Sequence, residues 1–137
     1  MKNTSNSRTY HHGEHIVYSC QYHVVFCPKY RRKVLVDGID VRLKELFPQI
    51  ARDLGGSVIE MEVMPDHVHL LVDIDPRMSA ADFVASLKRR SSHAIRTEFP
   101  AIKSRLPSLW TRGKFIGSVG SVSLDVVKQY IENQKGV

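Results

Sequence analysis

The sequence has few cysteines and no long apolar run. Cys20 and Cys27 are its only cysteines, and they form neither a CxxC pair nor a disulfide framework. This pattern is typical of a reducing compartment, so we expect a cytoplasmic location. A membrane-spanning helix needs roughly 18 consecutive apolar residues, and no stretch supplies them. These absences argue against a disulfide-stapled secreted protein and against a membrane-spanning one.

Two further absences concern nucleotide use and targeting. The sequence has no GxxxxGK[ST] loop, so a P-loop nucleotide-driven enzyme is not indicated. The first residues, MKNTSNSRTYHHGEH, are polar and lack the apolar centre of a secretory signal. We expect residues 1–15 to form a flexible tail and residues 16–137 to form a single domain.

Positive charge is abundant. Twenty Lys and Arg residues against fourteen Asp and Glu residues give a net charge of +6. Such a balance favours a polyanionic partner, most often nucleic acid. Hydrophobic residues make up 42% of the chain and charged residues 25%, as in globular domains. The composition therefore predicts a globular domain and favours a nucleic-acid partner, although many basic proteins bind none.

Hydrophobic periodicity predicts alternating strands and helices, with Pro100 and Pro107 breaking the chain. Strands are expected over residues 16–27, 57–63 and 67–74, with a short strand or hairpin over 109–120. Helices are expected over residues 40–54, from the Ser79 capping box to about Thr97, and over 123–135. The order β-α-β-β-α-β, then α, predicts an α+β, ferredoxin-like βαββαβ fold with an antiparallel sheet and helices on one face.

Two histidines stand one residue apart in the strand expected over 67–74. Because strand side chains alternate, His67 and His69 share one face, whereas Val68 and Leu70 face the core. Two imidazoles on one face can bind a single metal ion through their nitrogens. Alternatively, they are ordinary polar residues on a half-exposed strand.

The last expected helix offers a third metal ligand. Tyr130 and Gln134 are four residues apart, so they lie one above the other on that helix. Their row flanks the apolar row of Leu124, Val127 and Ile131, so we expect it to face protein. A Gln carbonyl is a suitable oxygen ligand for Mg²⁺ or Mn²⁺. The alternative is that Tyr130 packs in the fold and Gln134 is solvated.

Basic residues cluster in three places, each with an aromatic residue or a helix nearby. They are Lys29, Arg31, Arg32 and Lys33 around Tyr30, then Lys88, Arg89, Arg90 and Arg96 on the second helix, then Arg112 and Lys114 beside Trp110 and Phe115. Such clusters bind phosphates, and an aromatic ring can stack on an unpaired base. The alternative for any single residue is a solvated basic surface.

The remaining polar residues receive plainer interpretations. His23 is expected to be ordinary sheet surface, and Asp66 is expected to serve the turn before the histidine pair. His11, His12 and His15 are expected to be disordered tail residues.

Five segments of the chain, in order, match one known family. They are YHVVFCPKYRRKVL (22–35), MEVMPDHVHLLV (61–72), SLKRRSSHAIRTEFP (86–100), LWTRGKFIGSVG (109–120) and VVKQYIENQ (126–134). Together they resemble the small single-tyrosine HUH transposases of bacterial and archaeal insertion sequences, the TnpA-like family. HUH stands for His, a hydrophobic residue and His, here His67, Val68 and His69. The resemblance covers about residues 16–135.

The resemblance implies a transposase that cleaves and rejoins single-stranded DNA at the ends of its element. Tyr130, carried on the C-terminal helix, would attack a backbone phosphate and leave a 5′-phosphotyrosine and a free 3′-OH. His67, His69 and Gln134 would hold one Mg²⁺ or Mn²⁺ ion. The resemblance also implies binding of DNA hairpins near the element ends. It further implies a homodimer in which one subunit's tyrosine helix can complete the other's site.

Two other functions fit the same residues. One is a single-stranded nucleic-acid-binding module without catalysis, and the other is a metal-dependent nuclease that activates water. A covalent protein–DNA adduct would distinguish the transposase from both.

Overall fold

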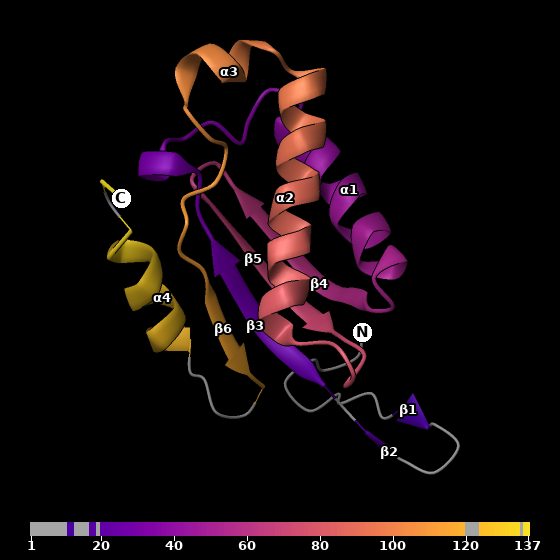
Figure 1. The fold of residues 1–137 in the computed structure, drawn as a ribbon. Helices are drawn as coiled ribbons and strands as arrows, with labels where there is room; N and C mark the ends of the chain where they lie inside the picture. Colours follow the sequence, from indigo (N-terminus) through magenta and orange to yellow (C-terminus); the bar gives the residue numbers. More distant parts are fainter. Residues whose placement is uncertain (1–10, 13–16, 19, 120–123, 135) are drawn as a thin grey trace.

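The computed structural model has a four-stranded antiparallel sheet at its centre (Figure 1). It describes residues 11–12, 17–18, 20–119, 124–134 and 136–137. The strands of this sheet are β3 (Gln21–Phe26), β4 (Ser57–Met64), β5 (His67–Asp73) and β6 (Phe115–Ser118). Their order is β4-β5-β3-β6, and every neighbouring pair is antiparallel. The predicted α+β fold with an antiparallel sheet is confirmed.

Two long helices cover one face of the sheet and form the core with it. They are α1 (Ile39–Asp53) and α2 (Ala80–Glu98), whose predicted ends differ from these by only one residue. The core residues include Val24, Phe26, Val68, Leu70, Leu43, Phe47, Phe83 and Leu87, each exposing 1% of its surface or less. The predicted cap is present, since the Ser79 hydroxyl accepts from the Asp82 N–H at 3.2 Å.

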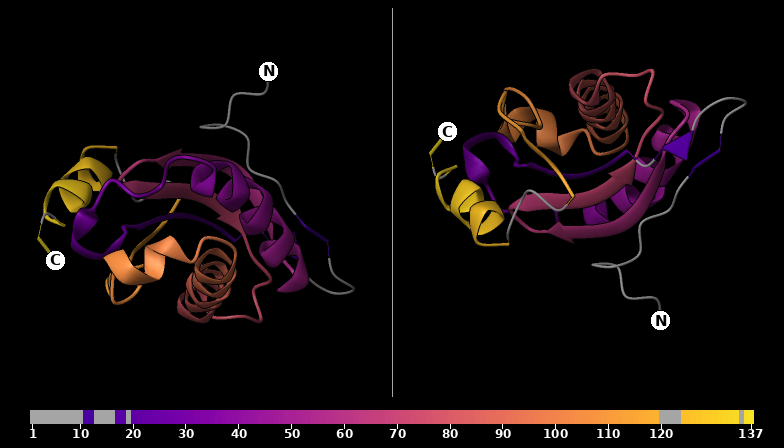
Figure 2. Two further views of the ribbon diagram at one scale, coloured as in Figure 1. Left: turned by 90° about the horizontal axis from the view of Figure 1, so that it is seen from above. Right: turned by 90° about the horizontal axis from the view of Figure 1, so that it is seen from below.

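The helix α4 (Leu124–Glu132) lies beside β3 and β6, at the edge of the molecule far from α1 (Figures 1 and 2). Two short helices complete the fold, the 3₁₀ helix η1 (Lys29–Arg31) after β3 and α3 (Ala101–Arg105) after α2. No helix in the described ranges is long and apolar enough to cross a bilayer.

The structure differs from the prediction between the two prolines. Residues 101–105 form α3 there, with Pro100 at its N-cap position. A proline has a fixed φ and no N–H to lose at a helix start, so it begins this helix instead of breaking the chain. The segment 109–120 contributes the single strand β6, and Trp110 makes only an isolated bridge to Pro28.

Part of the expected tail also has regular structure. β1 (His11–His12) pairs antiparallel with β2 (Val17–Tyr18) in a separate two-stranded sheet. The backbone groups of His11 and His12 therefore take part in a local strand pairing, while the flexibility of the tail stays a prediction. The rest of residues 1–15, His15 included, lies outside the described residues.

A bulge in β4 determines which side chains share a face with the histidine pair. The register shifts between Val58 and Glu60, so Val58 lies opposite Val72 and Glu60 lies opposite Leu71. The extra residue reverses the alternation, so both Glu60 and the later Glu62 face away from the core. Two carboxylates consequently lie on the sheet face that carries the histidines.

Candidate active site

His67 and His69 lie on the sheet face opposite the main core, as predicted from the alternation in β5. The intervening Val68 is fully buried in that core. His67 Nδ1 lies 2.9 Å from Oδ1 of Asp66. Because a carboxylate only accepts, Nδ1 carries the proton and Nε2 keeps a free lone pair. A carboxylate that orients an imidazole in this way is typical of metal-binding histidines.

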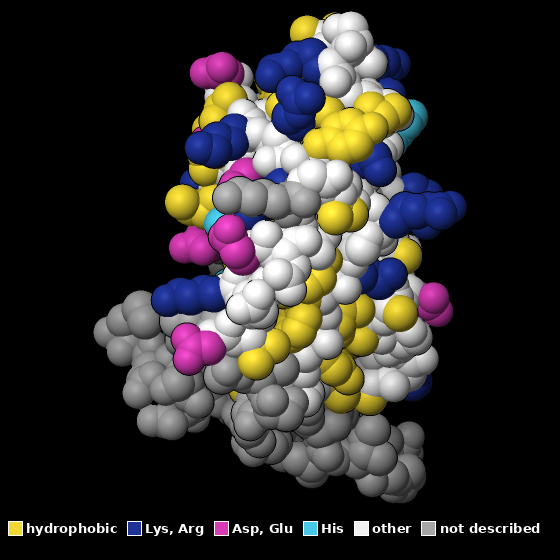
Figure 3. All heavy atoms as spheres, turned by 90° about the vertical axis from the view of Figure 1, so that its left-hand side faces the viewer, with side chains coloured by type: hydrophobic (Ala, Val, Ile, Leu, Met, Phe, Trp, Pro, Cys, Tyr) yellow, Lys and Arg dark blue, Asp and Glu magenta, His cyan; other side chains and the backbone are white. Residues whose placement is uncertain are grey.

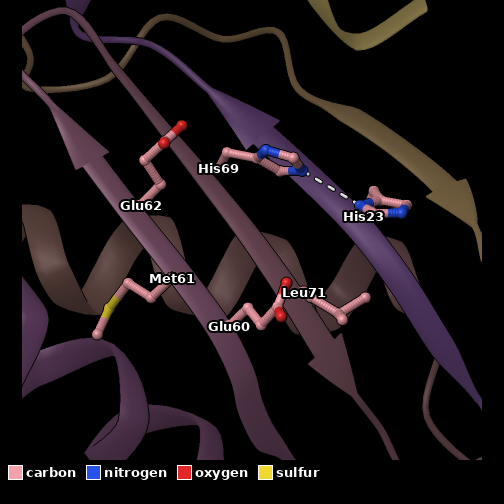
Figure 4. Close-up of a pocket in the computed structure, with 6 residues that line it drawn as sticks. All are labelled: His23, Glu60, Met61, Glu62, His69 and Leu71. Atoms are coloured by element: carbon pink, nitrogen blue, oxygen red, sulfur yellow. Dashed lines mark hydrogen bonds between the residues drawn. The ribbon is translucent and has the colours of Figure 1, made fainter. Parts of the chain in front are cut away.

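His69 has a partner that sequence reasoning missed. Its Nε2 lies 3.1 Å from Nδ1 of His23, and the two ring centroids are 5.3 Å apart (Figure 4). The interpretation of His23 as ordinary sheet surface was wrong. Strand register explains the contact, because Val25 pairs with His69 and His23 pairs with Leu71 on the same face. Only the pairing of two strands 46 residues apart could have revealed it.

The His23–His69 contact favours neutral rings. Burial lowers the pKa of His69, and the neighbouring His23 lowers it further. Burial also lowers the pKa of His23. A metal ion binds only unprotonated imidazole nitrogens, so both shifts favour ligation. If His69 donates through Nε2, its Nδ1 keeps the lone pair that could bind a metal.

A hollow of about 480 Å³ opens beside this pair of rings (Figure 4). It is lined by His23, Glu60, Met61, Glu62, His69 and Leu71. The two glutamates come from β4, and Oε1 of Glu62 lies 3.9 Å from Nε2 of His67. One wall of the hollow is therefore acidic.

Tyr130 and Gln134 lie together on the inner side of the C-terminal segment. The predicted helix over 123–135 is shorter than expected, because α4 ends at Glu132 and Gln134 lies in the turn that follows, where its N–H binds the Ile131 carbonyl at 3.1 Å. The phenol oxygen of Tyr130 and the amide oxygen Oε1 of Gln134 are both buried, and neither has a hydrogen-bond partner. A methyl group in place of the Gly113 hydrogen would lie 3.3 Å from the phenol oxygen and 3.7 Å from Oε1. The two oxygens thus face one small space beside Gly113.

Tyr130 is held on the histidine face of the sheet. Its ring lies 5.6 Å, centroid to centroid, from Phe115 of β6. Phe115 pairs with Val25, and Val25 pairs with His69, so the three side chains form a row across the sheet. Burial, with a smaller contribution from Cys27, raises the pKa of Tyr130 to about 12. The nucleophile expected from the sequence is therefore a protonated phenol at neutral pH.

The four expected residues are held by two sets of contacts in this structure. His67 and His69 bind Asp66 and His23, whereas Tyr130 and Gln134 share the space at Gly113. Among the described residues, no three His, Cys, Asp or Glu side chains gather as a metal-binding cluster. The Gln134 amide oxygen is the kind of atom that Mg²⁺ or Mn²⁺ binds, whereas two imidazoles are unusual ligands for Mg²⁺.

The basic residues expected to bind DNA differ in how free their side chains are. Figure 3 shows Lys and Arg side chains mainly on the upper half of the α4 side of the molecule, where η1 and α3 lie. The exposed side chains are those of Arg32, Lys33, Arg89 and Arg112, whereas those of Lys29, Arg31, Lys88, Arg90 and Lys114 are partly buried. Arg90 pairs with Asp53 at 2.7 Å. Phosphate contacts by these residues stay predictions.

Lys88 has protein partners that a phosphate would have to replace. Its ammonium donates to the backbone carbonyls of Thr111, Arg112 and Gly113, at 2.7, 3.2 and 3.0 Å. Burial, followed by Lys114, lowers the pKa of Lys88 to about 8. Lys88 therefore stabilises the segment 111–113, whose Gly113 lies against Tyr130 and Gln134.

The comparisons with known proteins agree with one another. A family model described as "Transposase IS200 like" matches residues 16–134. The ISDra2 transposase TnpA of Deinococcus radiodurans is 39% identical over 124 residues, which is 89% of each chain. The transposase of insertion sequence element IS200 from Salmonella typhimurium is 29% identical over 126 residues, covering 88% of this chain and 83% of the relative.

Two solved structures resemble this one. A crystal structure of a Deinococcus radiodurans R1 protein described as a transposase has a TM-score of 0.83 and 35% identity. It covers 93% of this chain and 99% of its own. A tyrosine transposase bound to a REP hairpin has a TM-score of 0.56 and 14% identity, covering 96% of this chain and 69% of its own. At that identity, the second likeness supports the fold alone.

Proposed function

Because this chain belongs to the IS200-like transposase family, we propose that it cleaves and rejoins single-stranded DNA at insertion-sequence ends through Tyr130. One observation carries the proposal. The phenol of Tyr130 and the amide oxygen of Gln134 are buried together without partners, on the sheet face that bears His67 and His69. Two unsatisfied buried oxygens are costly in a fold, so a functional reason for keeping them is expected.

In the proposed reaction, the Tyr130 oxygen attacks a backbone phosphorus and gives up its proton. A bond forms between the phenol oxygen and phosphorus, and the bond from phosphorus to the 3′-oxygen breaks. The 3′-oxygen takes up a proton and becomes a free 3′-OH, while the 5′-phosphate stays on the tyrosine. Rejoining reverses these steps with another 3′-OH, so no nucleotide cofactor is consumed.

His67, His69 and Gln134 would hold one Mg²⁺ or Mn²⁺ ion in this proposal. The ion would supply positive charge at the scissile phosphate. Asp66 would keep the His67 ring turned with Nε2 outward, and His23 would orient the His69 ring. Gln134 would complete this set from the same subunit or from a second one. Following the family resemblance, we propose a homodimer in which the tyrosine helix can act in trans.

The DNA partner would be single-stranded with hairpins near the element ends. Tyr30 supports this proposal, because 44% of its surface is exposed and the Lys29 ammonium lies 5.1 Å from its ring. An exposed aromatic ring among cations suits an unpaired base and its phosphates. A basic hollow of about 560 Å³ on α2 and α3 offers a second phosphate surface, lined by Arg89, Ser92, His93, Arg96, Thr97 and Lys103.

A labelled DNA strand tests the proposal directly. Single-stranded DNA from the flanks of the native gene is incubated with the protein and Mn²⁺, then separated on a denaturing gel. We expect wild type to form a labelled protein band and Tyr130→Phe to form none. Tyr22→Phe is the matched control, because this tyrosine packs against the core on the opposite face.

Each other outcome selects another function. Cleavage that survives Tyr130→Phe without an adduct would indicate a nuclease that uses activated water. Binding without cleavage of any flank would indicate a nucleic-acid-binding module.

A further inference from the structure

Arg31 connects the two halves of the candidate site. It lies in η1, and its side chain is only 13% exposed. Its Nε lies 3.3 Å from Oδ2 of Asp66, and its Nη1 donates to the backbone carbonyl of Ile131 at 3.0 Å. Glu132 lies 3.8 Å from the same Nη1. The guanidinium thus spans from the turn before the histidine pair to the last turn of α4.

These contacts continue into the expected metal ligands at both ends. The other oxygen of Asp66 accepts from His67 Nδ1 at 2.9 Å. The Ile131 carbonyl also accepts the backbone N–H of Gln134 at 3.1 Å. His67 and Gln134 are therefore joined through one carboxylate, one guanidinium and one peptide carbonyl. Two hydrogen bonds at the Ile131 carbonyl, one ion pair and the Asp66–His67 contact thus link the two residues.

The backbone around Arg31 is shaped for this position. Tyr30 and Arg31 both have positive φ values, 60° and 49°. Left-handed backbone is unfavourable for residues with a Cβ, and such strain clusters at functional sites. The Tyr30 N–H also binds the carbonyl of Val137 at 2.6 Å. The C-terminal segment is thus bound by the Tyr30 backbone at Val137 and by the Arg31 side chain at Ile131.

We propose that Arg31 is a positioning residue that couples the C-terminal end of α4 to the Asp66–His67 pair. This inference rests on the proposed function, in which Gln134 and His67 serve one ion. A guanidinium can bind a carboxylate and a carbonyl at once because its donors point in fixed, diverging directions. Its charge also complements the carbonyl end of the helix. Arg31 therefore acts on the reaction through Asp66 and Ile131 and does not itself touch the reacting atoms.

The test uses Arg31→Lys and Arg31→Gln in the full chain. Lysine keeps the charge but has one ammonium, so it cannot span both partners in the same geometry. Arg52→Lys is the matched control, since Arg52 is exposed in the last turn of α1. Thermal unfolding first confirms that each variant is folded, and Arg31→Lys decides the question if Arg31→Gln does not fold.

Two readouts need neither metal nor DNA. Hydrogen exchange at the Gln134 amide reports how firmly the C-terminal end of α4 is held at the Ile131 carbonyl. The nuclear magnetic resonance signal of the His67 Nδ1 proton reports its contact with Asp66. We expect Arg31→Lys to speed exchange at Gln134 by about tenfold or more and to shift or broaden the His67 signal. Arg52→Lys should change neither.

The third readout is the cleavage reaction, where we expect a kcat lower by about 10- to 100-fold, as for lost orienting partners of metal ligands, and a nearly unchanged KM. Unchanged exchange at Gln134 would overturn the inference. Faster exchange with an unaltered His67 signal would also overturn it, because Arg31 would then stabilise α4 without affecting the Asp66–His67 contact. Wild-type protein that forms no adduct would refute the proposed function instead, and the two metal-free readouts would still decide the coupling.

Discussion

The buried phenol of Tyr130 should titrate far above an ordinary tyrosine. Burial is the main cause, and it raises the pKa from 10.0 to about 12. At pH 8 an ordinary tyrosine is ionised in about 1% of molecules, whereas a pKa of about 12 leaves about 0.01%. The buried Tyr130 side chain therefore presents about 100-fold less phenolate than a solvated tyrosine would.

Ultraviolet absorbance of phenolate measures this directly. The pH titration of Tyr130→Phe is subtracted from that of wild type, so that only one of the five tyrosines contributes. We expect the difference curve to have its midpoint near the value of about 12 given by burial. In denaturant the same difference should titrate near 10, because the phenol is then solvated. A midpoint near 10 in the folded protein would refute the argument that Tyr130 is desolvated at Gly113.

The shift also fixes the sign of a pH effect on folding. The folded protein holds the Tyr130 proton more tightly than the unfolded chain does, since its pKa is raised. The contribution to stability is complete below pH 10 and is lost as pH rises toward about 12. Denaturant unfolding at several pH values should show that the free energy of unfolding falls less across this window in Tyr130→Phe than in wild type.

Three further predictions follow from other contacts. Ser91→Ala should lower the free energy of unfolding by about 1–3 kcal/mol in urea titrations. The buried Trp110 Nε1 donates to the Ser91 hydroxyl at 3.0 Å and would lose its acceptor. Wild-type stability would contradict this. Asp66→Ala should weaken Mn²⁺ binding by about 10- to 100-fold in calorimetry by releasing the His67 ring, and equal affinity would count against that orienting role. Mn²⁺ should support DNA cleavage at least as well as Mg²⁺, since imidazole is an unusual Mg²⁺ ligand; activity with Mg²⁺ alone would contradict this.

The positions that follow local periodicity were predictable from the sequence. Alternation in β5 placed His67 and His69 away from the core, and helical spacing placed Tyr130 beside Gln134. Both outcomes depend on residues that are close in sequence, although Gln134 lies just past the end of α4 at Glu132. The family resemblance then gave these positions a chemical meaning that periodicity alone does not supply.

Positions set by distant pairing were not predictable in this way. His23 meets His69 only because β3 and β5 pair in one register. Lys88 was counted as a phosphate-binding residue, yet its ammonium binds three carbonyls of a segment 23 or more residues away. Charge in a sequence does not reveal whether a flexible side chain ends in solvent or inside the fold.

The acidic wall beside His69 has a consequence for how molecules arrive. Glu60 and Glu62 line the hollow at one side of the ring, while basic side chains gather around η1 and α3. Carboxylates attract a divalent cation and repel a phosphodiester, and the basic side does the opposite. Under the proposed function, the ion and the nucleic acid would therefore approach the site from different sides. The bulge in β4 turns Glu60 and Glu62 outward, and it therefore determines that this face carries negative charge beside His69.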